Sequence, residues 1–375
     1  MSSKSIRRDF AETDFEAAKA LITWNALVEP GDRVAGQLIK TYGPVAALEA
    51  FTSNRDLGQE VQEAFARWEP RYSKSLADQK ITEAKKNDLK LLLPTDSVWP
   101  SSLNDLGNHS PLLLWYQGNI EHLESLSRSV GIVGSRNASH YGQRVTSDLT
   151  ALLVGEQAAV ISGGAVGIDS IAHRTALSLK GLTVAFMAGA LNCPYPSSNL
   201  ELFDQISHSG LLLSEMSPGA RPTRWRFLQR NRLIAALASA TVVTEAGWRS
   251  GSINTVNHAI ELGRPVFAIP GPITSPASAG CNRLIRDSQA SILLDLADLP
   301  VELGWHEDSA IALAGLGSLE LRALDALALE YQTTEQLLVS SGLALSELRV
   351  ALGALKLLGK VDSNGSGSWR LNKGK

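Results

Sequence analysis

The sequence has few of the features that mark an exported, metal-binding or membrane-spanning protein. Its 375 residues include two cysteines, Cys193 and Cys281, which lie far apart and lack the close spacing of metal ligands. This usage favours a reducing compartment and argues against a disulfide framework. No apolar run reaches the length of a membrane span, and no apolar core follows the charges of the N-terminal segment. We therefore expect a cytoplasmic protein without a disulfide, a metal site or membrane contact.

Positive charge is not in excess over the whole chain, but negative charge is missing from one stretch. The chain has 35 Lys and Arg against 38 Asp and Glu, and its formal net charge is −3. A nucleic-acid site would therefore have to be a local patch. No carboxylate occurs between Glu215 and Glu245, although this stretch carries five arginines. A candidate for such a patch is thus present.

The carboxylate-free stretch mixes arginines with aromatic residues. In order they are Arg221, Arg224, Trp225, Arg226, Phe227, Arg230 and Arg232. Guanidinium groups bind phosphates and stack on flat rings, and aromatics between cations stack on unpaired bases. We expect a helix from Leu233 to Ala240, so that the arginines lie in a loop and at a helix N-terminus, which favours anions. The alternative is a solvated loop whose arginines pair with distant carboxylates, but five unopposed arginines favour the anion site.

The hydrophobic periodicity divides the chain into three regions. Residues 1–75 predict short helices broken at Pro30-Gly31 and at Tyr42-Gly43-Pro44, as in a small helical (SAM-like) domain. Residues 80–300 contain nine short apolar runs that mostly alternate with amphipathic helical stretches. This alternation is typical of a doubly wound α/β domain with a parallel sheet. Residues 318–375, after a linker at 305–317, predict three helices and a Gly-rich hairpin, as in a winged-helix-like domain.

Turns rich in Gly and Ser follow three of the predicted strands. They lie at Gly134-Ser135-Arg136, at 162–169 and at 250–252. Carboxyl ends of parallel strands meet at one edge of a sheet, and ligands bind there. Glycine lets the backbone approach a phosphate, and Ser or Asp can cap the following helix. Neither a Walker lysine pattern nor a strict G-x-G-x-x-G is present, which argues against a conventional ATPase or dinucleotide enzyme.

Several single residues allow a functional and a structural interpretation. We expect Asp169 to cap its helix, and His140 and His173 to pack or form hydrogen bonds instead of binding a ligand. Glu245 is the best catalytic candidate, although we prefer a role in holding the arginine stretch. Tyr195-Pro196 predicts a rigid turn where stacking is possible. Both cysteines are expected to be buried and inert.

The last predicted helix, residues 345–358, argues against duplex recognition by the C-terminal region. It carries few charges, and its apolar residues predict a core face: Leu345, Leu348, Val350, Leu352, Leu355 and Leu358. A helix that enters the major groove would show more base-contacting polar residues. We expect an accessory or partner-docking module, and a chain ending near Asp298 should still bind single strands.

Taken together and in order, the motifs from Gly134 to Asn282 resemble the DNA-processing protein A family, also called DprA or Smf. The matching segments include Ser162-Gly163-Gly164-Ala165-Val166-Gly167-Ile168-Asp169, Arg230-Asn231-Arg232 and Gly280-Cys281-Asn282. The resemblance implies an extended Rossmann-like domain that binds single-stranded DNA and forms a homodimer through that domain. It also implies protection of incoming DNA and loading of the RecA recombinase in natural transformation and recombination. It implies no enzymatic turnover and no cofactor.

Carried over by motif, the resemblance places a DNA pocket at the glycine-rich edge of the sheet. Its residues would be Ser135, Arg136, Gly163, Gly164, Gly167, Arg224, Phe227, Arg230, Asn231, Arg232, Ser250, Gly251 and Ser252. The alternative is an enzyme, because the fold and turns also resemble the lysine-decarboxylase-like (LOG) nucleotide-sugar hydrolases. That family uses a Gly-Gly-x-Gly-Thr turn and a nearby Glu. Residues 246–252 lack the full motif, although Glu261 could serve, so we prefer the DNA-binding protein.

Overall fold

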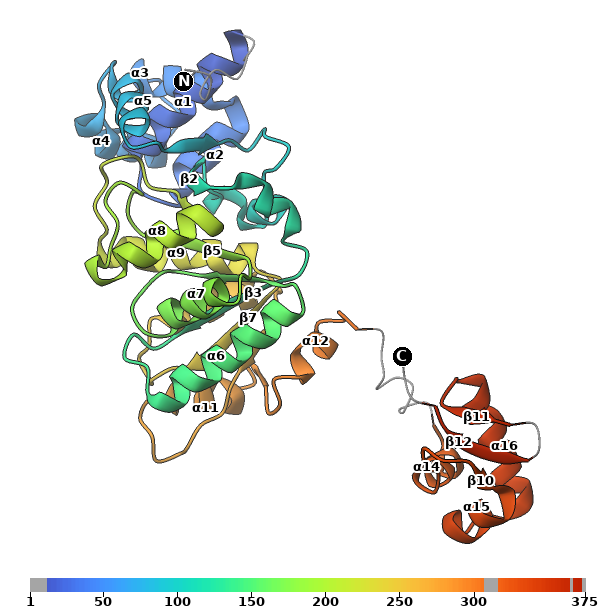
Figure 1. Ribbon diagram of the computed structural model, residues 1–375. Coiled ribbons are helices and arrows are strands. Elements are labelled where there is room, and N and C mark those ends of the chain that lie inside the picture. The colour runs from blue at the N-terminus through green and yellow to red at the C-terminus, as the bar shows by residue number, and fades with distance from the viewer. Residues whose placement is uncertain (1–11, 307–315, 365–366, 373–375) are drawn as a thin grey trace, which may run out of the picture. The chain divides into compact units, whose positions relative to one another are not determined.

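The computed structural model describes residues 12–306, 316–364 and 367–372 (Figure 1). The chain divides into two compact units, one ending at Leu299 and the other beginning at Pro300. The N-terminal helices and the large sheet thus fall in the same unit. The three-domain division that the sequence suggests stays a prediction.

From residue 12 onward, five α-helices precede the large sheet. They are α1 (Glu12–Leu27), α2 (Arg33–Tyr42), α3 (Pro44–Thr52), α4 (Gln59–Trp68) and α5 (Leu76–Lys86). The predicted breaks after α1 and α2 are confirmed: Asp32 caps α2 by accepting from the Val34 N–H at 3.0 Å, and Gly43 has φ +79°. The helices bury an aromatic cluster of Trp24, Phe51, Phe65 and Trp68. Short 3₁₀ helices follow in the chain: η1 (Glu69–Arg71), η2 (Ser101–His109), η3 (Ile120–Ser125) and η4 (Ser197–Asn199).

Nine strands form one sheet, and all nine were expected from the apolar runs. They are β1 (Lys90–Leu92), β2 (Leu114–Gly118), β3 (Ser129–Gly134), β4 (Ala159–Ser162), β5 (Thr183–Met187), β6 (Leu211–Ser214), β7 (Ala240–Glu245), β8 (Val266–Ala268) and β9 (Ser291–Ile292). The order across the sheet is β1-β2-β6-β5-β4-β3-β7-β8-β9. The chain moves from β3 outward to β6 and then returns to the other side of β3. A topological switch point therefore lies between β3 and β7.

The sheet is parallel over most of its width, as the sequence predicted, and has an antiparallel edge that was not predicted. From β6 to β9 every pair is parallel, whereas β1 pairs with β2, and β2 with β6, in the antiparallel sense. An apolar run predicts a buried strand but carries no information about its direction. An antiparallel edge on a doubly wound sheet is common.

Helices cover both faces of the sheet, as expected for a doubly wound fold. The connecting helices are α6 (His140–Gly155), α7 (Ile168–Ser178), α8 (Leu200–Ser209), α9 (Arg224–Leu237), α10 (Ser252–Glu261) and α11 (Ala279–Arg286). Helices α6, α7 and α8 pack in series, whereas α9 packs against α10. Both α7 and α9 contact β3 and β4 from separate layers, and Figure 1 shows α6 and α7 lying across the sheet. The central sheet is thereby buried on both sides.

Helix α9 begins nine residues earlier than the sequence predicted, at Arg224 instead of Leu233. Its N-cap is Thr223, whose hydroxyl accepts from the Arg226 N–H at 3.2 Å. The predicted start was wrong because the dense arginines suggested a loop. Arginine has a good helix propensity, and two of these arginines pair with carboxylates, so their repulsion does not prevent the helix. Four of the five arginines therefore lie on one helix.

The C-terminal unit has a small core of its own. Helix α12 (Asp298–Glu302) spans the boundary, and then come α14 (Ser318–Asp325), β10 (Gln332–Thr333), α15 (Thr334–Ser341), α16 (Leu345–Leu357), β11 (Val361–Ser363) and β12 (Ser368–Leu371). The strands form an antiparallel sheet in the order β10-β12-β11. Part of the predicted linker, 307–315, and the hairpin tip, 365–366, lie outside the described residues. The winged-helix assignment stays a prediction.

The predicted core face of α16 is only partly correct. Leu348, Leu352 and Leu355 are buried, but Leu345 and Val350 are 44% and 63% exposed. Among the described residues, no single helix is long and apolar enough to cross a membrane. Helices α15 and α16 reach that length and hydropathy only when taken together, and they are bent by 104° relative to each other.

Candidate nucleic-acid interface

A cleft of about 570 Å³ opens at the switch point between β3 and β7. Ligands of open α/β sheets bind at this place, beyond the carboxyl ends of the strands. The lining includes eight of the expected site residues: Ser135, Arg136, Phe227, Arg230, Asn231, Ser250, Gly251 and Ser252. Segments from β3, α9 and the start of α10 thus meet at one cavity, as the sequence predicted.

Phe227 lies close to two guanidinium groups on the cleft wall. The Arg136 guanidinium carbon is 4.8 Å from the centre of the Phe227 ring, and that of Arg230 is 5.8 Å away. Tyr195 packs edge-on against the same ring, with 5.9 Å between the ring centres, and is 54% exposed. A flat ring with a cation beside it suits a base with its phosphate. The expected stacking role of Tyr195 stays a prediction.

Arg136 and Arg230 differ in their surroundings. Arg136 is exposed immediately after β3, whereas Arg230 is 5% exposed and donates to the carbonyl oxygens of Gly163 and Phe186. Burial lowers the pKa of Arg230 to about 10, the Arg136 charge acts in the same direction, and Asp169 opposes it. The Arg230 guanidinium therefore stays charged at neutral pH but has two backbone acceptors already.

The glycine turn after β4 positions the cleft wall but does not line it. A Cβ on Gly163 would lie 2.0 Å from Arg230 Nη1, and a Cβ on Gly167 would lie 2.3 Å from the Ser135 carbonyl oxygen. Gly164 packs against Phe203, and the neighbouring Ala165 and Asp169 line the cleft instead. The expected glycines are thus required for close packing around Arg230 and the β3 loop. Their direct contact with DNA stays a prediction.

Asp169 holds the glycine turn instead of capping its own helix as expected, because the N-cap of α7 is Gly167 and no side chain caps it. Its carboxylate is buried and accepts from the Ala165 N–H at 3.3 Å, with Gly163 N–H as a second donor. Burial raises the pKa of Asp169, and the Arg230 charge opposes that shift. The carboxylate and the guanidinium therefore stabilise each other within the cleft wall.

The turn before α10 contributes a helix N-terminus and one further cation. Helix α10 starts at Ser252 without a side-chain cap, and the Ser250 and Ser252 hydroxyls lie 2.8 Å apart. Asn231 donates to the Gly251 carbonyl oxygen at 3.3 Å and so joins α9 to this turn. Such a helix terminus favours anions. Arg249, exposed in the same turn, also lines the cleft. Sequence reasoning missed it, although a cation within a Gly-Ser turn was a usable signal.

Arg226 and Arg232 are not unopposed, which corrects the sequence expectation. Arg232 is 3% exposed and forms a two-pronged ion pair with Glu215, at 2.7 and 2.8 Å. Arg226 pairs in the same way with Glu29 at 2.9 Å, and this contact lowers the pKa of Glu29. Neither arginine lines the cleft. Arg226 joins α9 to the segment between α1 and α2, and Arg232 joins α9 to Glu215 at the end of β6.

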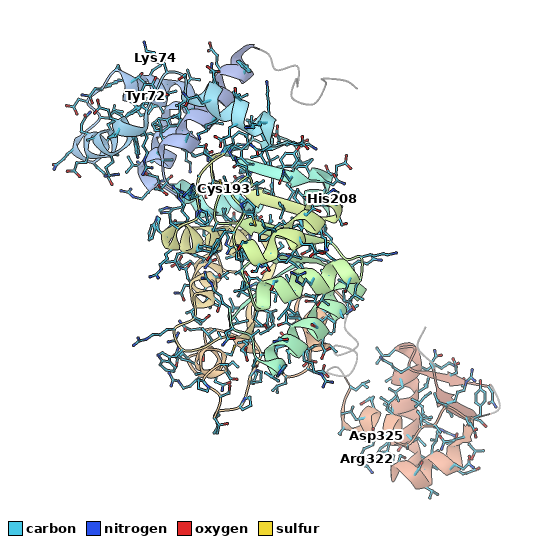
Figure 2. The ribbon with its side chains drawn as sticks, turned by 60° about the vertical axis from the view of Figure 1, so that its left-hand side comes forward. Tyr72, Lys74, Cys193, His208, Arg322 and Asp325 are labelled. Carbon is cyan, nitrogen blue, oxygen red and sulfur yellow. The ribbon has the colours of Figure 1, made fainter. Side chains whose placement is uncertain are left out.

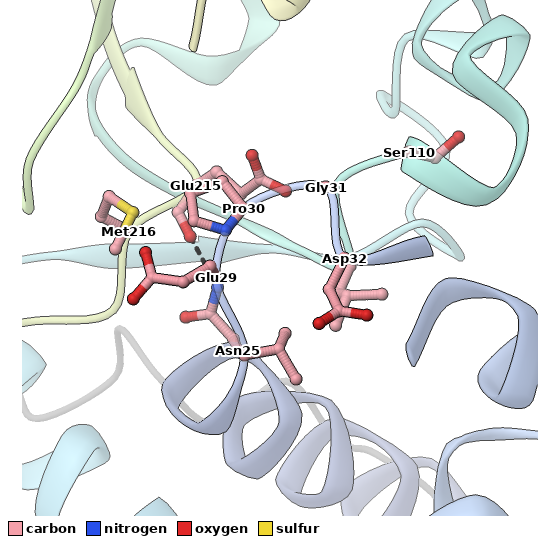
Figure 3. A pocket seen from close by; sticks show the side chains of 10 residues that line it. Asn25, Glu29, Pro30, Gly31, Asp32, Ser110, Glu215 and Met216 are labelled. Carbon is pink, nitrogen blue, oxygen red and sulfur yellow. Dashed lines mark hydrogen bonds between the residues drawn. The ribbon is translucent and has the colours of Figure 1, made fainter. Parts of the chain in front are cut away.

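Figure 3 shows this junction, a pocket of about 10 Å³ that Glu29, Glu215 and Asn25 line. Asn25 donates to the Glu215 carbonyl oxygen at 2.6 Å and accepts from the Trp115 indole at 3.0 Å. The space is about that of one water molecule, so it is a structural junction and no ligand site. Arg224, the remaining helix arginine of the expected set, is exposed but also lies outside the cleft lining.

Other single-residue expectations have mixed outcomes. Glu245 does not hold the arginine stretch: its carboxylate accepts from the Ser139 N–H and hydroxyl, and so fixes the start of α6. His173 is buried against the Thr183 hydroxyl at 2.7 Å, as expected for a packing residue. Cys281 is buried, and burial raises its pKa to about 12, but Cys193, labelled in Figure 2, is partly exposed. Among the described residues no group of His, Cys, Asp and Glu could hold a metal ion.

The fold and the cleft define an extended Rossmann-like protein with a cationic, aromatic-lined cavity at its switch point. Residues 90–304 match the family model described as DNA recombination-mediator protein A. A putative DNA processing protein DprA of Mycobacterium tuberculosis is 36% identical over 373 residues, covering 94% of each chain. The chain belongs to this DNA recombination-mediator (DprA/Smf) family.

Two solved structures support the same assignment. DprA of Streptococcus pneumoniae is 28% identical, with a TM-score of 0.63 over 76% of this chain and 97% of that one. DprA of Helicobacter pylori, whose structure concerned its single-stranded DNA binding mode, is also 28% identical, with a TM-score of 0.53 over 58% of this chain and 96% of that one.

Proposed function

We propose that this protein binds single-stranded DNA in the switch-point cleft, protects incoming strands and passes them to the RecA recombinase. The observation that carries the proposal is the Phe227 ring on the cleft wall, with the Arg136 and Arg230 guanidiniums 4.8 and 5.8 Å from its centre. Bases must be unpaired to stack on such a ring, whereas phosphates reach exposed cations in any strand. Membership of the DprA family and the single-strand binding of the Helicobacter pylori relative support the choice of ligand.

The proposal includes a homodimer formed through the Rossmann-like unit, action in the cytoplasm and no catalytic turnover. Dimerisation and RecA loading rest on the family resemblance. The surroundings of the two glutamates that a hydrolase would use, Glu245 and Glu261, support the absence of turnover. Glu245 uses both carboxylate oxygens on Ser139, and Glu261 is exposed outside the cleft lining beside His258.

Binding to single and double strands is the first test. Fluorescence anisotropy with an unpaired oligothymidylate and a duplex of equal length should show clear preference for the single strand. Little sequence preference is expected, because every base offers a face for stacking. Equal affinity for the two forms would count against the proposed cleft.

The salt dependence tests the cations one by one. On single strands each phosphate contact contributes a slope of about −0.7 in log K against log salt. Arg136→Ala should flatten the slope by about one contact, and Arg249→Ala should do the same. Arg33→Ala is the charge-matched control: it removes an exposed arginine of α2 that pairs with Glu60 of α4, and it should leave the slope unchanged. If neither Arg136→Ala nor Arg249→Ala changed the slope, these two arginines would not contact phosphates.

A release assay separates the enzyme from the binding protein. Nucleoside monophosphates carrying a releasable base would be incubated with the unchanged protein and with Glu245→Gln and Glu261→Gln. We expect no turnover in any of them. Release by the unchanged protein that either variant loses would favour the hydrolase.

A further inference from the structure

Trp248 is an exposed aromatic residue at the rim of the cleft. It is 51% exposed, and its chain neighbours Gly247 and Arg249 both line the cavity. The Ser250 N–H donates to the Gly247 carbonyl oxygen at 3.1 Å, so Trp248 and Arg249 are the central residues of a tight turn. The ring and the Arg249 cation therefore project from one turn next to the cleft.

Helix α11 packs against the turn that carries Trp248. The Arg283 guanidinium carbon is 4.7 Å from the ring centre. The Gly280 N–H donates to the Ala246 carbonyl oxygen at 2.7 Å, and a Cβ on Gly280 would lie 2.5 Å from the Gly247 carbonyl oxygen. The helix and the turn thus approach as closely as glycine permits. The backbone of this turn therefore has little conformational freedom left to lose when a ligand binds.

The same pairing of ring and cation occurs twice around the cleft. Phe227 and Arg136 are separated by 4.8 Å on the α9 side, and Trp248 and Arg283 by 4.7 Å beside the α10 turn. We propose that Trp248 and Arg283 form an outer stacking platform, on which a base of single-stranded DNA rests where the strand leaves the cleft. The inference rests on the proposed function, because the strand must first occupy the cleft.

Charge and position favour a nucleic acid over a second copy of this chain as the occupant. Among the described residues Arg283 forms no salt bridge, and Arg249 next to Trp248 forms none either. Two unpaired guanidiniums beside an exposed indole suit phosphates and a base. A surface shared by two identical copies would bring these cations against each other unless carboxylates on the other copy faced them.

The experiment uses the full chain and oligothymidylates of increasing length, with binding measured by fluorescence anisotropy. Trp248→Ala should leave the affinity for the shortest bound oligomers unchanged, since these fill only the cleft. It should lower the affinity for longer oligomers by about five-fold or more, which is the effect of losing one stacked base. Trp248→Phe should restore most of the loss. Tyr331→Ala is the matched control, because it removes an exposed ring that also lies 4.7 Å from a guanidinium, that of Arg370 in the other unit.

The position of the stacked base gives an independent readout. A 2-aminopurine placed at successive positions of a long oligomer should change its fluorescence on binding at one outer position, and this change should disappear in Trp248→Ala. Equal affinity of the variant and the unchanged protein at every length would overturn the platform alone. Absence of binding by the unchanged protein would overturn the proposed function as well. A Trp248→Ala variant that loses self-association in sedimentation, with its affinity per protomer unaltered, would make the rim an interface between copies and also overturn the platform.

Discussion

At the scale of single residues, burial separates arginines of the same stretch into different roles. Arg230 holds two backbone carbonyls and keeps its charge within the wall, whereas Arg136 remains free to move towards a phosphate. Arg232 is as buried as Arg230 but is neutralised by Glu215. A buried guanidinium with backbone acceptors supplies positive potential without a large rearrangement on binding. Position on α9 alone does not decide which arginine can bind DNA.

His173 predicts how stability responds to acid. Burial lowers its pKa from 6.5 to about 3, with the Arg230 charge acting in the same direction. Between these values the unfolded chain takes up a proton that the folded chain does not. The free energy of unfolding should therefore fall as the pH falls from about 6.5, by at most about 1.4 kcal/mol per pH unit from this residue. Urea unfolding at pH 7, 6, 5 and 4 measures this fall in the free energy of unfolding.

Other groups also titrate in this pH range, so the contribution of His173 is obtained by comparing the unchanged protein with a His173 variant. Glu29, with a lowered pKa, adds to the loss in acid, whereas Asp169, with a raised pKa, acts in the opposite direction. His173→Gln removes the titrating ring, so its stability should depend less steeply on pH than that of the unchanged protein. His208→Gln, at an exposed histidine labelled in Figure 2, is the control. Parallel curves for the unchanged protein and His173→Gln would contradict the assignment.

At the scale of elements, the turn between β4 and α7 connects packing to binding. Gly163→Ala would place a methyl group 2.0 Å from Arg230 Nη1 and 2.3 Å from its Cζ, so the guanidinium must move. Arg230 would then lose its contacts to the Gly163 and Phe186 carbonyls and leave buried polar groups unpaired. We expect a loss of stability of about 1–3 kcal/mol and weaker single-strand binding, measured by urea unfolding and anisotropy.

Gly155→Ala provides the matched control for this substitution. Gly155 lies at the end of α6, has nothing within 4 Å of an added Cβ, and does not have a positive φ. Alanine there should be neutral or slightly stabilising, since glycine is the poorer helix former. If Gly163→Ala behaved like Gly155→Ala in both assays, the turn would not position Arg230.

The sequence predicted the elements of the fold better than their contacts. Nine apolar runs predicted nine strands, and the Gly-Ser turns predicted the edge at which the cleft opens. The start of α9 was missed because the carboxylates that neutralise its arginines, and so allow them to share one helix, are remote in the sequence. Glu29, for example, lies 197 residues from Arg226. The sequence could not show that Gly163 accommodates a guanidinium, because that contact joins residues 67 apart. Local patterns cannot encode such partners.

At the scale of the whole molecule, the two units differ in their cations and not in their exposed apolar side chains. Both expose apolar side chains, such as Leu294 at 76% in the first unit and Val339 at 86% in the second, but the cationic cleft belongs to the unit ending at Leu299. The cations of the C-terminal unit are mostly engaged within that unit: Arg370 pairs with Asp362, and Arg322 donates to the carbonyls of Ser341 and Gly342. The surface of the C-terminal unit therefore favours a partner-docking role over the electrostatic binding of DNA.

Removing the C-terminal unit should therefore leave single-strand binding almost unchanged. A chain truncated after Gly304 retains β9, α12 and the whole cleft lining, and the sheet is complete by Ile292. We expect cooperative unfolding, which circular dichroism would confirm, and an affinity for oligothymidylate within a few-fold of the full chain. The electrostatic contribution of a lightly charged unit is small, so the salt slope should also persist. A folded truncation that loses tenfold in affinity, about 1.4 kcal/mol, would instead assign part of the DNA site to the C-terminal unit.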